Sequence, residues 1–75
     1  MMTPRPLFDR LAALGYDTEK IADICGVTPN AVTRWRSGSR KLPAEALTRL
    51  FGIVTASRKF KNMKLSECYT GGQNE

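Results

Sequence analysis

The sequence contains no histidine and only two cysteines, Cys25 and Cys68, among its 75 residues. Two cysteines without a histidine cannot complete the four-ligand set of a structural zinc site. The sequence also lacks a glycine-rich phosphate-binding loop and has no nucleophile paired with a base at a useful spacing. We therefore expect a protein that is not an enzyme, that uses no metal and no cofactor, and that takes no small-molecule ligand.

Long apolar segments are absent as well. No apolar run approaches the ~18 residues of a membrane-spanning helix, and the N-terminal residues do not form a signal-peptide pattern. We expect a cytoplasmic protein without membrane contact, and in that reducing compartment no disulfide. Cys25 falls on an apolar helix position and is expected in the core, whereas Cys68 lies near a polar tail and is expected to be exposed.

Positive charge is concentrated in the second half of the chain. The net charge is +5, and residues 34–64 hold nine basic residues against the single acidic residue Glu45. Such a region attracts polyanions, of which nucleic acid is the commonest. Charge alone is equally compatible with a solvated basic face that aids solubility.

The spacing of the apolar residues predicts four helices and no β-strand. The helices are expected over residues 4–14, 18–25, 29–37 and 43–54. Residues suited to N-caps precede the first three helices, at Thr3, Asp17 and Thr28, and a glycine follows each of them. The residues expected to face the core are Leu7, Phe8, Leu11, Ala12, Leu14, Ile21, Ala22, Ile24, Cys25, Ala31, Val32, Trp35, Ala46, Leu47, Leu50, Phe51, Ile53 and Val54.

The second and third predicted helices are separated by a very short turn around Gly26. Two helices joined in this way can pack at a steep angle, with the second projecting from the surface. Ala22 supplies a small residue where the helices cross, and Gly26 tolerates a positive φ in the turn. Val27 is expected as an apolar plug of the turn, with Val32 and Trp35 as the inward residues of the second helix. The pattern therefore predicts a helix-turn-helix.

The opposite face of the third helix is polar. Its outward residues are predicted to be Asn30, Thr33, Arg34 and Ser37, with Thr28 and Pro29 at the exposed N-terminal end. Small polar side chains with an arginine make a face that can enter the major groove and bond to base edges.

These residues resemble a known family. The stretch TEKIADICGVTPNAVTRWRSG, residues 18–38, resembles the helix-turn-helix of lambda repressor and Cro-like regulators of the XRE type, with matching positions at Ala22, Gly26, Val27, Val32 and Trp35. The continuation to Pro43 is also similar, and the resemblance covers roughly residues 7–54. It implies a compact all-α domain of four to five helices over residues 1–54, followed by a short basic C-terminal extension over residues 55–75.

The resemblance also implies roles for individual residues. The residues implied to read bases are Thr28, Pro29, Asn30, Thr33 and Arg34. The residues implied to contact phosphates are Thr18, Lys20, Arg36, Ser37, Ser39, Arg40 and Lys41. The implied function is a double-stranded DNA-binding transcriptional regulator, a repressor that binds a pseudo-palindromic operator as a homodimer, with autoregulation and an origin in a phage or other mobile element as further expectations. The alternative is a module of the same fold that binds a partner protein and does not read DNA.

Three hypotheses compete for residues 55–75. They can form a dimer contact through Phe60, Met63 and Tyr69, lie along DNA as a basic arm using Arg58, Lys59, Lys61 and Lys64, or be disordered. We favour the dimer contact, because proteins of this class commonly read two half-sites with two modules. Residues 71–75 are predicted to be a flexible terminus.

Overall fold

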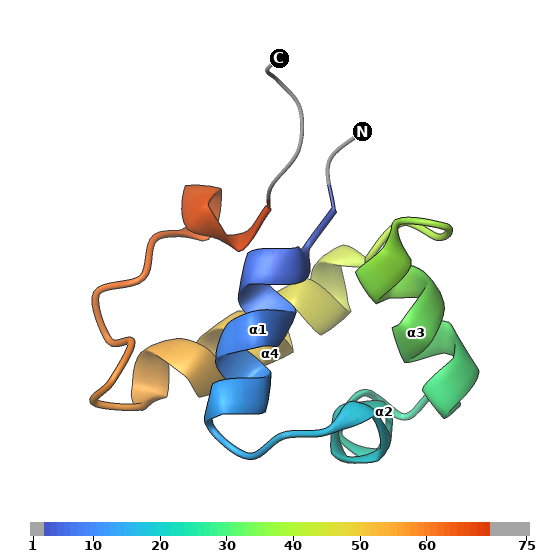
Figure 1. The fold of residues 1–75 in the computed structure, drawn as a ribbon, viewed down its shortest axis with the longest axis horizontal. Coiled ribbons are helices and arrows are strands. Elements are labelled where there is room, and N and C mark those ends of the chain that lie inside the picture. The colour runs from blue at the N-terminus through green and yellow to red at the C-terminus, as the bar shows by residue number, and fades with distance from the viewer. Residues whose placement is uncertain (1–2, 70–75) are drawn as a thin grey trace.

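Four α-helices and one short 3-10 helix make up the part of the chain that the structure, a computed structural model, describes, namely residues 3–69. The elements are α1 (Arg5–Ala13), α2 (Thr18–Cys25), α3 (Pro29–Ser37), α4 (Ala44–Ala56) and the 3-10 helix η1 (Leu65–Cys68) (Figure 1). No β-strand occurs within residues 3–69. The predicted all-α fold with four helices is confirmed. None of the described helices combines the length and apolar character needed to cross a membrane.

The ends of α2 and α3 follow from local sequence. The Asp17 carboxylate accepts a hydrogen bond of 2.8 Å from the Lys20 N–H, and Thr28 Oγ1 accepts one of 3.4 Å from the Ala31 N–H. Both are N-cap bonds that satisfy amides left free in a first helical turn. The first helix begins one residue later than predicted, because Pro4 rather than Thr3 occupies the N-cap position and its carbonyl accepts from the Phe8 N–H.

One hydrophobic core joins all four helices. Its fully or almost fully buried members are Leu7, Phe8, Leu11, Ile21, Ala22, Val32, Trp35, Leu42, Ala46, Leu50, Val54, Met63 and Cys68. Six further expected core residues are partly buried and pack against it, namely Leu14, Cys25, Ala31, Leu47, Phe51 and Ile53. The other two lie outside it, since Ala12 is exposed and Ile24 is only half-buried. Each residue turns an α-helix by about 100°, so both lie on the flank of their helix rather than on its core-facing side.

Leu42 is a core residue that the sequence pattern did not single out. It is 4% exposed and directly precedes Pro43, the N-cap of α4. An apolar residue before an N-cap often packs against the fourth residue of the helix, here the partly buried Leu47. The spacing between Leu42 and Leu47 was the sequence signal that could have predicted the burial of Leu42. The buried Leu42 side chain anchors the loop between α3 and α4.

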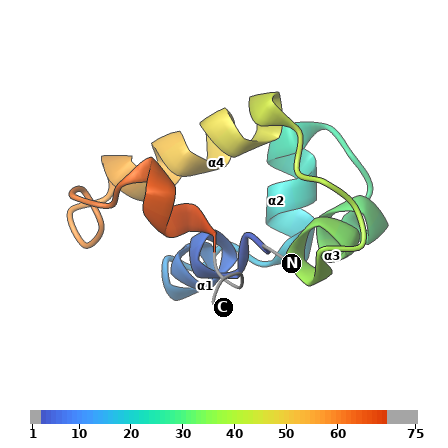
Figure 2. The ribbon, with the colours of Figure 1, turned by 90° about the horizontal axis from the view of Figure 1, so that it is seen from above.

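The chain after α4 folds back onto α1. Residues 57–69 run along the side of α1 and α4 that faces away from α2 and α3 (Figures 1 and 2). Met63 is 8% exposed and Cys68 fully buried, so the expected exposure of Cys68 is wrong: η1 packs against α1 and encloses the thiol. Disorder is likewise wrong for residues 55–69, whereas the predicted flexible terminus at residues 71–75 lies outside the described residues.

This packing bears on the predicted dimer contact. Met63 belongs to the core of its own chain and has little surface left for a partner, while Phe60 and Tyr69 are half-buried against the same core. Residues 57–69 therefore share one hydrophobic core with the helix-turn-helix rather than forming a separate appendage.

Candidate nucleic-acid interface

The turn between α2 and α3 comprises residues 26–28 and is closed by backbone hydrogen bonds. Gly26 ends α2 with φ 70° and ψ 35°, the left-handed conformation that an L side chain adopts with strain. The Val27 N–H donates to the Ala22 carbonyl at 2.9 Å. The expected plug is wrong, because the Val27 side chain is 37% exposed and only borders a hollow next to Trp35. The turn is held by its backbone and by the buried residues of both helices.

Two buried residues orient α3. Val32 is fully buried and Trp35 is 3% exposed, as predicted, so one side of α3 is pinned against α1 and α2. The other side carries the residues implied to read bases, and all of them are exposed: Thr28, Pro29, Asn30, Thr33 and Arg34. They form a continuous polar surface at the start and along the outer side of α3.

The hydrogen-bonding capacity of this surface is partly committed. The Thr33 hydroxyl donates to the Pro29 carbonyl at 3.1 Å, which leaves its oxygen as an acceptor. Thr28 Oγ1 accepts the capping bond and keeps its own proton to donate. Within residues 3–69, no hydrogen bond or ion pair engages the side chain of Asn30 or Arg34. These two side chains keep their full bonding capacity for a ligand.

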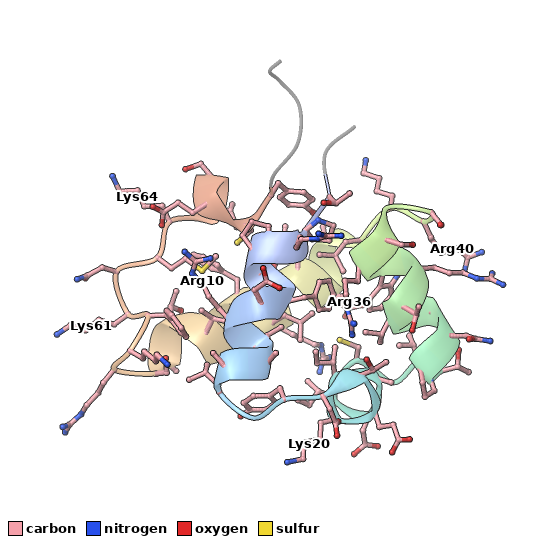
Figure 3. The ribbon with its side chains drawn as sticks, viewed as in Figure 1. Arg10, Lys20, Arg36, Arg40, Lys61 and Lys64 are labelled. Atoms are coloured by element: carbon pink, nitrogen blue, oxygen red, sulfur yellow. The ribbon has the colours of Figure 1, made fainter. Side chains whose placement is uncertain are left out.

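The loop after α3 is folded back onto the end of that helix. The Ser37 hydroxyl donates to the Arg34 carbonyl at 3.2 Å and lies 3.0 Å from the Ser39 hydroxyl. The Arg40 N–H donates to the same Arg34 carbonyl at 3.2 Å. The loop is therefore ordered by α3 itself, and it presents Arg40 and Lys41 as exposed cations beside the polar surface. Figure 3 shows Arg40 extending outward past the end of α3.

Arg36 and Thr18, both implied phosphate contacts, are brought together across the molecule. The Arg36 guanidinium donates to Thr18 Oγ1, at the first residue of α2, and its Cζ atom lies 5.9 Å from the centre of the Phe8 ring. Figure 3 places the Arg36 side chain between α1 and α3. Lys20 also has a contact within the chain, because its Nζ donates to the Gly15 carbonyl at 3.4 Å. The side chains of these three residues thus make contacts within the protein, whereas the Arg40 side chain makes no hydrogen bond or ion pair within residues 3–69.

The basic residues do not form one surface. Figure 3 shows Arg40 at one end of the molecule and Lys61 and Lys64 at the other, with α1 between them. The fold adds Arg10 to the second group, with its Cζ atom 5.6 Å from the centre of the Phe60 ring. The charge distribution along the sequence did not reveal this division, because residues 57–69 double back along α1.

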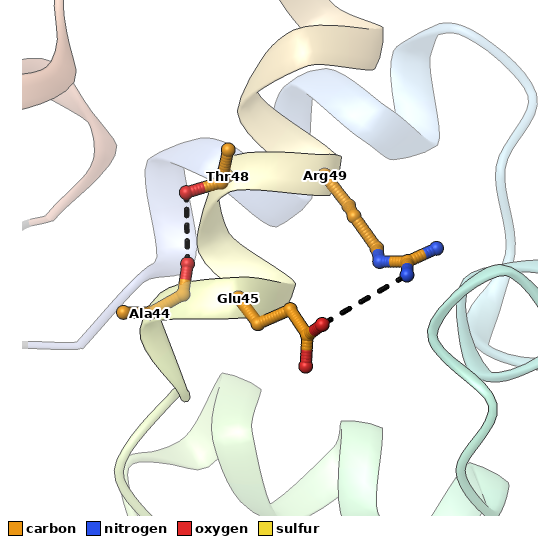
Figure 4. Close-up of polar contacts among 4 residues, drawn as sticks. All are labelled: Ala44, Glu45, Thr48 and Arg49. Atoms are coloured by element: carbon orange, nitrogen blue, oxygen red, sulfur yellow. Dashed lines mark hydrogen bonds and ion pairs between the residues drawn. The ribbon is translucent and has the colours of Figure 1, made fainter.

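Ion pairs neutralise almost none of this positive charge in the described part of the chain. The only ion pair within residues 3–69 joins Arg49 and Glu45, at 4.0 Å on α4, where the Thr48 hydroxyl also donates to the Ala44 carbonyl (Figure 4). An exposed pair one helical turn apart stabilises a helix by only ~0.3–0.5 kcal/mol. The cations around α3 therefore remain available to an anion.

No protein-family model, curated protein or solved structure matches this chain. What remains is the chemistry of the surface itself. An arginine and an amide on an exposed helix are the side chains that bond guanine and adenine edges, and flanking cations are the groups that contact phosphates.

Proposed function

We propose that this protein is a sequence-specific, double-stranded DNA-binding regulator of the lambda repressor and Cro-like class, which acts in the cytoplasm. One observation carries the proposal: α3 is anchored by Val32 and Trp35 while Asn30 and Arg34, on its outer side, are exposed and without partners within residues 3–69. Because Val32 and Trp35 hold α3 in place, these two exposed side chains are presented to a ligand in a fixed arrangement.

The surface supports a specific reading mode. Arg34 can donate two hydrogen bonds to the O6 and N7 atoms of a guanine, and Asn30 can bond the N6 and N7 atoms of an adenine. Each such bidentate contact is worth ~1–3 kcal/mol of discrimination against a wrong base. Arg40, Lys41, Ser37 and Ser39 would then hold the adjacent phosphates and set the register of α3 in the groove.

A single module of this size reads few base pairs. We therefore propose that two copies bind a pseudo-palindromic operator, with the two α3 helices roughly 34 Å apart, one turn of the duplex. Where such a site overlaps a promoter, the bound protein represses transcription. We also propose that the protein represses its own promoter and originates from a phage or other mobile element.

Selection of bound duplexes from a random pool tests the function. We expect enrichment of a motif with two related half-sites, and binding that weakens steeply as salt rises, because bound phosphates release counterions. A variant with Asn30→Ala and Arg34→Ala, two exposed changes that leave the core intact, should enrich no motif. Absence of duplex binding even at low salt would contradict the proposal and favour the protein-interaction module.

A further inference from the structure

A second basic surface lies on the side of the molecule away from α3. We define the distal basic surface as Arg10, Arg58, Lys59 and Lys61, which surround a shallow hollow that Phe60 and Met63 also line. Three of its four residues come from the segment that follows α4, and Arg10 comes from α1. The surface therefore exists only because residues 57–69 fold back along α1.

Two of the four cations, Arg10 and Lys59, contact an aromatic ring or a carbonyl rather than a carboxylate. Arg10 Nη1 donates to the Pro6 carbonyl at 3.2 Å, and its Cζ atom lies 5.6 Å from the centre of the Phe60 ring. Lys59 Nζ lies 5.5 Å from the centre of the same ring. A cation–π contact of this kind orients a cation without neutralising its charge.

Among the described residues that line the hollow, Glu67 is the one acidic residue, so four cations face a single carboxylate. Glu67 Oε1 accepts a hydrogen bond of 2.8 Å from the Lys64 N–H at the start of η1. Within residues 3–69 none of the four cations has an ion-pair partner. The hollow and its rim thus carry a clear excess of positive charge.

We propose that the distal basic surface binds the phosphates of a second DNA duplex, so that the protein bridges two DNA segments. The bridging role rests on the proposed function, since α3 holds the first segment. The distal surface and the loop of Arg40 lie at opposite ends of the molecule, so DNA docked on α3 leaves the distal surface free (Figures 1 and 3).

The composition of the surface favours nucleic acid over an acidic protein. Protein interfaces bury an apolar core, whereas here the Phe60 ring is half-buried and flanked by two cations. Exposed lysines and arginines on a loop are suited to backbone phosphates, which are bound without regard to sequence. A second copy of the chain is also disfavoured, because its Arg58 and Lys61 would face the same positive charges.

The test uses two duplexes and two variants of equal charge. The duplex selected from the random pool is attached to beads and saturated with the full chain, and a fluorescent 20-base-pair duplex of random sequence is then added. The distal variant is Arg58→Gln with Lys61→Gln, and the matched control is Arg5→Gln with Arg49→Gln, which removes the same charge from outside the hollow. Wild type and control should capture the second duplex, and the distal variant should capture much less of it.

The affinity for the immobilised duplex should stay within about two-fold in the distal variant. The slope of log affinity for the second duplex against log salt should fall by about two, since two phosphate contacts are lost. The proposal is overturned if wild type binds the immobilised duplex but captures no second one, or if the distal variant captures it as well as the control.

Direct binding of the random-sequence duplex gives an independent readout. The distal variant should bind it more weakly than the matched control, whether or not the pool yields an enriched motif. Failure of enrichment alone contradicts the proposed function, whereas equal binding by the two variants contradicts the distal surface.

Discussion

The Arg36 guanidinium on α3 donates a hydrogen bond to Thr18 Oγ1 on α2, across 18 positions of sequence. The same guanidinium lies above the Phe8 ring of α1, so one side chain links three helices. Because this contact fixes the end of α3 relative to the start of α2, it helps set the angle at which the proposed reading helix leaves the body of the protein.

A double-mutant cycle measures this link. Thr18→Val and Arg36→Met remove the hydrogen bond while keeping most of the side-chain volume. We expect a coupling free energy of about 0.5–1 kcal/mol in urea unfolding, below the ~1.5–3 kcal/mol of a buried hydrogen bond with a charged donor, because both groups reach solvent. Thr48→Val on α4 serves as the control partner, and its cycle with Arg36→Met should give no coupling. Equal coupling in the two cycles would show that the Thr18 contact contributes nothing specific.

Arg34→Ala and Arg40→Ala separate base reading from phosphate contact. Arg34→Ala should weaken binding to the selected duplex by ~1–3 kcal/mol and leave binding to random-sequence DNA nearly unchanged. Arg40→Ala should weaken both to a similar extent and lower the salt slope by about one. Gel-shift titrations at several salt concentrations measure all of these quantities. If Arg34→Ala weakened binding to the selected and the random-sequence duplex equally, as Arg40→Ala is expected to do, Arg34 would not be a base-reading residue.

Two glycines make a matched pair for the turn. A Cβ atom at Gly26 or at Gly52 would meet no heavy atom within 4 Å, so only backbone conformation distinguishes the two positions. Gly26→Ala should destabilise the fold by ~1–2 kcal/mol, because φ is 70° there. Gly52→Ala, inside α4, should stabilise it by up to ~1 kcal/mol. Thermal unfolding of both variants gives the comparison. If Gly52→Ala destabilised the protein, backbone conformation would not be what distinguishes the two glycines.

Met63→Ala tests how the segment after α4 is held. Removal of a buried methionine side chain should destabilise the protein by ~2–5 kcal/mol. Leu65→Ala, two residues away and 54% exposed in the wild type, should change stability by less than ~0.5 kcal/mol. The loss at Met63 should not depend on protein concentration. A loss that disappears at low concentration would instead place Met63 in a dimer contact.

The two thiols should differ in reactivity. Cys25 is half-buried and should be alkylated by iodoacetamide in the native protein, whereas the fully buried Cys68 should react only after unfolding. Mass spectrometry of peptides from native and urea-treated protein distinguishes the two. Rapid labelling of Cys68 under native conditions would contradict its enclosure by η1.

The buried thiol also predicts a dependence of stability on pH. Burial raises the pKa of Cys68, with Glu67 adding to the rise and Arg10 opposing it. The folded protein then holds the thiol proton more tightly than the unfolded chain, so this contribution is fully present below the ordinary pKa of 9.0 and is lost as the pH rises through the higher value. Urea unfolding on both sides of that pH should show a smaller alkaline loss for Cys68→Ala than for wild type.

Much of the helix-turn-helix was predictable because its determinants are local. Asp17 and Thr28 cap their helices through amides three residues ahead, and Gly26 supplies the left-handed residue at the turn. The inward positions of Val32 and Trp35 follow from helical periodicity. The exposure of Asn30 and Arg34 was predictable for the same reason, since they lie on the other side of one short helix.

The sequence by itself determined the four helices, the N-caps of α2 and α3 and the polar outer side of α3, since each depends on residues within one or two turns of one another. Only the tertiary structure decided that Cys68 is buried, that Arg36 joins Thr18, and that Arg10 meets Phe60 on a second basic surface. These contacts depend on how residues 57–69 return along α1 and how α3 crosses α2. Such long-range packing is set by the whole core, and no periodicity or charge count along the chain encodes it.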